Sequence, residues 1–149
     1  MILNPWEIKH REMIRKRGLE NNPLVKFSSE TDHTWLRYIA REAFDLRLYL
    51  SNGELKDWLF EHDLIECLVT CRIQDNLIGI GVRRLNKESS YDRTNGFFVK
   101  PAYRRLGIGS KLFEMLKSYG VQNVTYGTLS GHDFYMEMLQ RHPDSCELI

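Results

Sequence analysis

One stretch of the chain decides the fold, and it reads FFVKPAYRRLGIGSKLF over residues 97–113. Its apolar start is typical of a β-strand and stops at Pro101, which has no N–H to donate to a neighbouring strand. Two arginines and two closely spaced glycines follow, and an amphipathic helix begins directly after them. A helix N-terminus is thereby placed at the carboxyl end of a strand, where its unsatisfied N–H groups can bind an anion. The stretch therefore predicts an anion-binding site.

The composition fits one soluble domain with its own core. The chain has 149 residues, of which 42% are hydrophobic. Its 21 Lys and Arg against 20 Asp and Glu give a net charge of +1, which argues against bulk nucleic-acid binding. Three cysteines without framework spacing predict a reducing compartment. No apolar run approaches the roughly 20 residues of a membrane span, and no signal-peptide pattern is present, so we expect a cytoplasmic protein without a membrane partner.

Charge is distributed unevenly along the chain. The charged residues of segment 54–66 are mostly acidic, whereas those of segment 100–117 are mostly basic. An anionic ligand near the basic segment and a cationic acceptor near the acidic one would suit this pattern. Solvated helix faces explain the acidic run equally well. His33 and His62 lack the spacing of metal ligands, so we expect no metal site.

The predicted elements follow an α+β order. A basic helical extension, residues 1–22, ends its helix at Gly18 and precedes a domain over residues 23–149. We expect a helix cap at residues 28–30, a hairpin turn at residues 75–76, and either close backbone approach or a bulge at Gly79 and Gly81. The expected strands are 24–27, 65–73, 77–85, 92–99, 121–129 and 146–149, and the expected helices are 5–20, 35–44, 54–61, 109–119 and 131–141. The middle strands form an antiparallel meander, and one right-handed β-α-β crossover spans residues 92–129.

Three glycine-rich motifs compete for residues 104–112. A P-loop would need glycine-lysine-serine or threonine, which Gly109-Ser110-Lys111 does not supply. A dinucleotide fingerprint would need a glycine where Leu112 stands and an acidic residue on the next strand, and both are missing. What remains is Arg104-x-x-Gly107-x-Gly109. Without Cβ atoms in the way, a pyrophosphate can approach the N–H groups that open the helix, while Arg104 and Arg105 add charge.

This motif, preceded by a strand that ends in valine-x-proline, resembles the acetyl-CoA-binding motif of the GNAT (Gcn5-related N-acetyltransferase) superfamily. The resemblance covers residues 24–141 and is strongest over residues 97–120. It implies a central mixed, mostly antiparallel sheet flanked by helices, acetyl-CoA as co-substrate, and direct acetyl transfer to a primary amine. It places the pantetheine arm along Phe98 and Val99, with a main-chain N–H of one of them near the thioester carbonyl. It places the pyrophosphate at the backbone of Arg105, Leu106, Gly107, Ile108, Gly109 and Ser110.

The resemblance also suggests an acid and a base for the transfer. Phe134-Tyr135-Met136-Glu137 matches the family pattern that supplies the general acid, here Tyr135, although a core tyrosine fits the same helix. The base is not specified. Asp92 on the fourth strand is one candidate, Glu66 and His132 are others, and a chain of water molecules would serve equally well. Trp35 and Tyr38 fall on a helix that walls the acceptor cleft in this family.

The chain departs from the family pattern in three places. Thr128 stands where the family often has asparagine, Gly131 stands where alanine is expected, and the C-terminus is shortened, since only residues 146–149 could represent the two further strands of a typical member. A second hypothesis therefore stays open: a GNAT-fold binding or structural module, within an assembly or homodimer joined through the N-terminal helix. A small nucleic-acid-binding protein is a third, which rests on that basic helix alone. The acceptor also stays open between a polyamine, an aminoglycoside and a protein amine.

Overall fold

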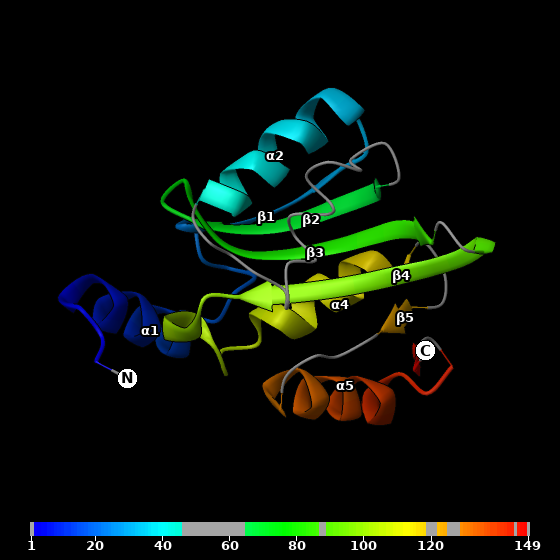
Figure 1. Ribbon diagram of the computed structural model, residues 1–149. Coiled ribbons are helices and arrows are strands. Elements are labelled where there is room, and N and C mark those ends of the chain that lie inside the picture. The colour runs from blue at the N-terminus through cyan, green and yellow to red at the C-terminus, as the bar shows by residue number, and fades with distance from the viewer. Residues whose placement is uncertain are drawn as a thin grey trace.

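The computed structural model describes residues 2–45, 65–86, 89–118, 122–124, 129–144 and 146–148. They form a 6-stranded sheet in the order β1-β2-β3-β4-β5-β6, with helices on both faces (Figure 1). The strands are β1 (Val25–Glu30), β2 (Ile65–Ile73), β3 (Asn76–Asn86), β4 (Ser89–Val99), β5 (Gln122–Val124) and β6 (Cys146–Leu148). The described helices are α1 (Pro5–Arg17), α2 (His33–Asp45), α4 (Ile108–Lys117) and α5 (Leu129–Arg141), and Pro101–Tyr103 forms the 3-10 turn η2.

The strand pairing confirms the predicted α+β architecture. β1 to β4 pair antiparallel in sequence order, and β4 pairs in parallel with β5 across the crossover helix α4. β5 and β6 add a second parallel pair, joined through α5. The predicted strand over residues 65–73 is β2 with the same bounds. The helix expected over residues 54–61 lies outside the described residues.

The cap expected at residues 28–30 is wrong, because these residues continue β1. They pair with Thr70, Val69 and Leu68 of β2. The longer β2 offers pairing partners to this polar segment, so the edge strand β1 continues through it. The cap of α2 is Asp32, whose Oδ1 accepts a hydrogen bond from the Thr34 N–H at 2.9 Å.

Two further boundaries differ from the prediction. The hairpin turn lies one residue earlier than expected, at Gln74 and Asp75, which have φ angles of 50° and 69°. Of the strand expected over residues 121–129, the structure describes Gln122–Val124 as β5, residues 121 and 125–128 lie outside the described part, and Leu129 is the first residue of α5. A short apolar run does not by itself distinguish a strand from the start of a helix.

Gly79 and Gly81 of β3 allow close approach to the sheet, as the sequence predicted. A Cβ at Gly79 would lie 3.2 Å from both Ile108 Cγ2 and Leu112 Cδ1 on α4. A Cβ at Gly81 would lie 2.7 Å from Val69 Cγ2. Gly79 therefore lets α4 pack closely on the sheet, and this packing sets where the α4 N-terminus lies relative to the end of β4.

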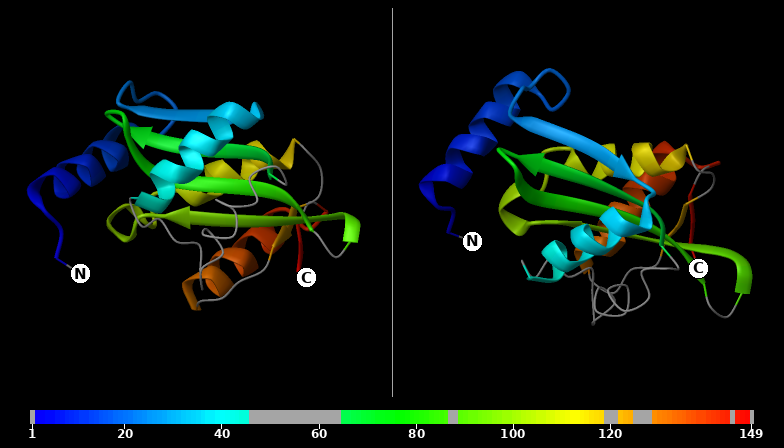
Figure 2. Two further views of the ribbon diagram at one scale, coloured as in Figure 1. Left: turned by 45° about the horizontal axis from the view of Figure 1, so that its top comes forward. Right: turned by 90° about the horizontal axis from the view of Figure 1, so that it is seen from above.

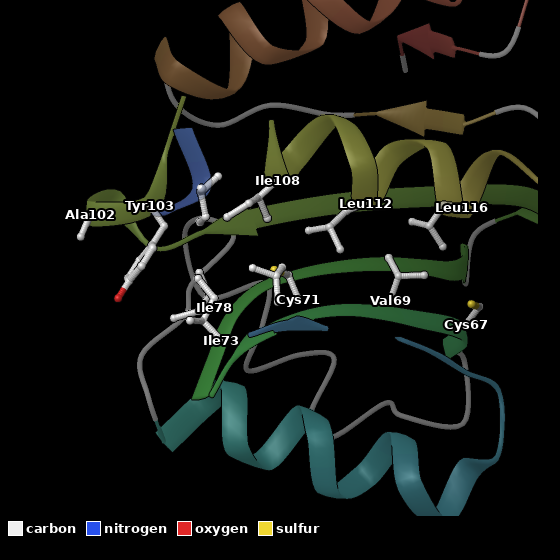
Figure 3. Close-up of a cluster of buried hydrophobic side chains, with 12 residues drawn as sticks. Cys67, Val69, Cys71, Ile73, Ile78, Ala102, Tyr103, Ile108, Leu112 and Leu116 are labelled. Carbon is white, nitrogen blue, oxygen red and sulfur yellow. The ribbon is translucent and has the colours of Figure 1, made fainter. Parts of the chain in front are cut away.

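Each face of the sheet carries a hydrophobic cluster. The cluster under α4 is drawn in Figure 3, in which α2 lies on the opposite side of the sheet. α2 buries Leu36 against that opposite face, and α5 packs beside α4 through Phe113, Tyr135 and Met138. α4 is thus held by the sheet and by α5 at once. The α4 cluster comprises Ile14, Val25, Cys67, Val69, Cys71, Ile73, Ile78, Ala102, Tyr103, Ile108, Leu112 and Leu116.

α1 lies beyond the end of the sheet, next to η2 (Figure 2). It begins with a capping box, in which Asn4 Oδ1 accepts from the Glu7 N–H and the Asn4 N–H donates to Glu7 Oε1, each at 2.9 Å. It ends at Gly18, where φ is 78°, as the sequence predicted. Across the described part of the chain, no helix has the length and apolar character to cross a membrane.

Candidate functional site

Among the described residues, the last residues of β4 pair with a strand on one side only, and we call their other side the open edge. β4 pairs with β3 as far as Val99, whereas its described pairing with β5 is confined to Asn95 opposite Val124. Within the described ranges, no strand pairs with residues 96–99 on the side away from β3. A pantetheine arm can lie beside β4 only where the fourth and fifth strands part. The described pairing is compatible with such a parting.

The register determines which main-chain groups face that open edge. Lys100 N donates to Ile78 O at 2.9 Å, so the Lys100 N–H points toward β3. Because hydrogen bonding alternates along an antiparallel strand, the Phe98 N–H also points toward β3, where Phe98 lies opposite Ile80. The N–H and C=O groups of Phe97 and Val99 consequently point to the open side. Phe98 and Val99 were the two residues expected to offer a main-chain donor, and of these Val99 has its N–H on the open side. The Phe97 N–H lies on that side as well.

Arg104 contacts this strand end with its side chain. Its Nε donates to the Val99 carbonyl oxygen at 2.9 Å, and its guanidinium carbon lies 5.5 Å from the centre of the Phe98 ring. Partial burial lowers the pKa of Arg104, but a guanidinium stays protonated at any physiological pH. Among the described residues, no ion pair includes Arg104 or Arg105. Arg104 therefore fixes the Val99 peptide group and brings a positive charge beside it.

The loop that follows turns through two left-handed residues. Arg105 has a φ of 63° and Gly107 a φ of 90°. Glycine suits the second position, because an L side chain would be strained there. Gly107 is the N-cap of α4, and no side chain caps this helix end. The first N–H groups of a helix have no partner within it, so this N-terminus can donate hydrogen bonds to an anion.

Gly109 has a structural role that the sequence did not reveal. A Cβ at this position would lie 3.1 Å from Phe134 Cε2, so the missing side chain lets α5 pack closely against α4. The Phe134 ring lies 5.5 Å from that of Phe97, which joins this contact to β4. Gly107 thus allows the left-handed turn, whereas Gly109 allows α5 to pack closely against α4.

The contacts between α1 and this loop could not be read from the sequence either. Arg11 Nη1 donates to the carbonyl oxygens of Ala102 and Arg104, each at 2.9 Å. His10 Nδ1 lies 2.8 Å from the Tyr103 hydroxyl, and both side chains are buried. Burial raises the pKa of Tyr103, and the nearby Glu7 raises it further. These partners lie 91 to 93 residues apart, and carbonyl acceptors carry no side-chain signature.

The candidate acid Tyr135 and the base candidates Asp92 and Glu66 come from different elements of the fold. Tyr135 is only 4% exposed and packs with Phe113 and Met138. Asp92 lies in β4 and precedes Val99 by roughly 23 Å of strand, at about 3.3 Å per residue. Glu66 Oε2 accepts from Arg83 Nε at 3.1 Å. The side chain of His132 lies outside the described residues.

α2 exposes an aromatic pair on its outer surface. Trp35 and Tyr38 are 58% and 63% exposed, and their ring centres lie 6.0 Å apart. In the part of the chain that the structure describes, no three His, Cys, Asp or Glu side chains gather in a way that could hold a metal ion.

Comparisons with known proteins agree with this geometry. Residues 29–135 match the model of the acetyltransferase (GNAT) family, and the chain therefore belongs to that family. No curated protein matches the chain in sequence. The fold is similar to that of the ribosomal-protein-alanine N-acetyltransferase from Brucella melitensis biovar Abortus 2308, at 14% identity and a TM-score of 0.51, over 76% of this chain and 89% of that one.

A second similar structure is a Salmonella typhimurium protein solved with its cofactor acetyl-CoA. It shares 13% identity and a TM-score of 0.51, over 79% of this chain and 78% of that one. At these identities the two structures confirm the fold, including the mostly antiparallel sheet flanked by helices. The family model over residues 29–135 confirms the GNAT membership that the motif at residues 104–109 predicted.

Proposed function

We propose that this protein is an acetyl-CoA-dependent N-acetyltransferase that transfers an acetyl group directly to a primary amine. The observation that carries the proposal is the direction of the Val99 N–H at the end of β4, which points away from β3 and has no partner strand among the described residues. The same strand leads into the loop before the α4 N-terminus. An acyl-CoA has an extended arm whose amides can pair with a strand edge, and a pyrophosphate that suits a helix N-terminus. Family membership supports the same ligand.

In the proposed complex, the N–H groups of residues 105–110 hold the pyrophosphate, and Arg104 and Arg105 supply charge. The pantetheine arm lies along Phe97 and Val99 in the place of a neighbouring strand. The Val99 N–H donates to the thioester carbonyl and stabilises the oxyanion that forms there. The Val99 carbonyl accepts from Arg104, and the Phe97 carbonyl supplies a further acceptor for the arm. Phe98 contributes its ring, next to Arg104, rather than its amide.

The transfer needs a neutral amine that attacks the thioester carbon. A C–N bond forms, the C–S bond breaks, and the CoA thiolate takes up a proton. We assign the proton donor to Tyr135. Because Asp92 lies so far along the strand, it could act as a base only through a chain of water molecules, and we assign the amine proton to water.

CoA release from acetyl-CoA, measured against a panel of primary amines, tests the proposal. The panel includes a polyamine, an aminoglycoside, a lysine-containing peptide with a blocked N-terminus and a peptide with a free one. Release that saturates with one acceptor class would support the transfer reaction. Release no faster than that from acetyl-CoA alone, across the whole panel, would contradict it.

A second candidate is a CoA-binding module without turnover. The burial of Tyr135 among Phe113 and Met138 favours it, because a tyrosine needed for core packing has less freedom to meet a thiolate. This candidate predicts that CoA binds and that no amine in the panel accelerates its release.

A further inference from the structure

We propose that α1 positions the loop that holds the CoA pyrophosphate, with Arg11 as the positioning residue. The proposal rests on the proposed function, since it assumes that this loop binds CoA. Its basis is the pair of hydrogen bonds from Arg11 Nη1 to the carbonyl oxygens of Ala102 and Arg104, each at 2.9 Å. One NH₂ group of the guanidinium thereby joins the η2 turn to the start of the loop. Such charge-assisted bonds are among the stronger ones in proteins.

The loop conformation explains why this support matters. Arg105 has a φ of 63°, and a left-handed conformation is unfavourable for a residue with a side chain, so surrounding contacts must hold it. The Arg104 carbonyl and the Arg105 N–H belong to one planar trans peptide group and point in opposite directions. By bonding the carbonyl, Arg11 fixes this plane and directs the Arg105 N–H away from α1. Arg11 thus orients a main-chain donor without itself touching the ligand.

Other contacts make α1 and its following residues a continuous support for the loop. The buried pair of His10 and Tyr103, at 2.8 Å, joins α1 to η2. Glu20 Oε1 lies 3.3 Å from Lys111 Nζ in the first turn of α4. Leu19 Cδ1 would lie 3.6 Å from a Cβ at Gly107. Contacts from residues 10–20 therefore reach η2, the glycine turn and the α4 N-terminus in succession.

Two substitutions at Arg11 separate the donor from the side-chain stem. Arg11→Met keeps an apolar stem and removes both hydrogen bonds, whereas Arg11→Lys keeps an ammonium that can donate to both carbonyls. Arg15→Met is the matched control, because Arg15 is exposed one turn further along α1 and its side chain donates no hydrogen bond to a described residue. The readouts are the CoA dissociation constant by calorimetry, KM and kcat with acetyl-CoA, the melting temperature, and amide hydrogen exchange over residues 102–107 without ligand.

We expect Arg11→Met to raise the CoA dissociation constant about tenfold, since fewer molecules hold the loop in the binding conformation. KM should rise with it, kcat should stay unchanged, and exchange over residues 102–107 should accelerate. Arg11→Lys should recover most of the affinity, and Arg15→Met should match the wild-type protein. A merely structural role would lower the melting temperature of Arg11→Met without changing KM.

Wild-type affinity and exchange in Arg11→Met would overturn the proposal. A lysine variant as weak as the methionine variant would overturn the hydrogen-bonding role. If the wild-type protein binds no CoA, the proposed function fails, and the cofactor role of α1 fails with it. The exchange measurement would then still show whether Arg11 holds the loop, so the two failures can be told apart.

Discussion

Replacing Arg104 by glutamine or by methionine separates the hydrogen bond of this residue from its charge. Gln Nε2 stands the same number of bonds from the backbone as Arg Nε, which donates to the Val99 oxygen at 2.9 Å. Arg104→Gln therefore keeps a donor in the same place and removes the positive charge. Arg104→Met has a similar length and removes both.

The size of the effect follows from the Val99 contact. A hydrogen bond from a charged donor contributes about 1.5 to 3 kcal/mol, and a neutral one about 0.5 to 1.5 kcal/mol. Without this bond, the end of β4 loses order in Arg104→Met, and binding of acetyl-CoA must restore it. At about 1.36 kcal/mol per factor of ten, the acetyl-CoA dissociation constant should therefore rise about 10- to 150-fold. Arg104→Gln keeps the neutral bond, so its dissociation constant should rise only about tenfold.

Calorimetric titration of both variants at one fixed ionic strength provides the assay, with urea unfolding as a check on the fold. Lower affinity in the methionine variant than in the glutamine variant would support a role for the Val99 bond. Equal affinity in the two variants would refute it, because charge alone would then explain the contribution of Arg104.

Three further predictions follow from other contacts. Gly81→Ala puts a Cβ 2.7 Å from Val69 Cγ2 and should lower the free energy of unfolding by about 1 to 3 kcal/mol in urea, with partial recovery on adding Val69→Ala; wild-type stability would contradict this. Tyr135→Phe should lower the rate of acetyl transfer about 10²-fold without changing acetyl-CoA affinity, and an unchanged rate would remove Tyr135 from the acid role. Burial raises the pKa of Cys71 to about 12, so the folded state retains a proton that the unfolded state loses. The resulting stabilisation is complete below the ordinary thiol pKa of about 8.5, and the free energy of unfolding should fall by up to about 1.4 kcal/mol per pH unit between roughly pH 9 and 12. Cys71→Ala should lack this part of the slope, and identical slopes in both proteins would contradict it.

The strand, loop and helix of the candidate site could be predicted from the sequence because local signals determine them. Pro101 has no N–H to continue the pairing of a strand, and Gly107 permits a left-handed turn because it has no side chain. The close approach at Gly79 and Gly81 was predictable for the same reason, since two glycines within an apolar strand leave room for a neighbour.

The remaining features depend on register and on contacts between distant segments. Whether the Phe98 or the Val99 amide faces the open edge depends on how β4 pairs with β3, and apolar residues on both sides of this strand do not determine that. The contact of Gly109 with Phe134 joins two helices, and only the packed structure reveals it. The role of Arg11 depends on main-chain acceptors in a distant loop, so its sequence signal is one basic residue among several on α1.

Calorimetric titration of the wild-type protein with acetyl-CoA tests most directly whether the β4 edge and the α4 N-terminus form an acetyl-CoA site. We predict saturable binding of one acetyl-CoA per chain, with a dissociation constant between about 1 μM and 1 mM, the range in which the KM values of most enzymes fall. Absence of binding at millimolar acetyl-CoA would contradict the assignment of this site.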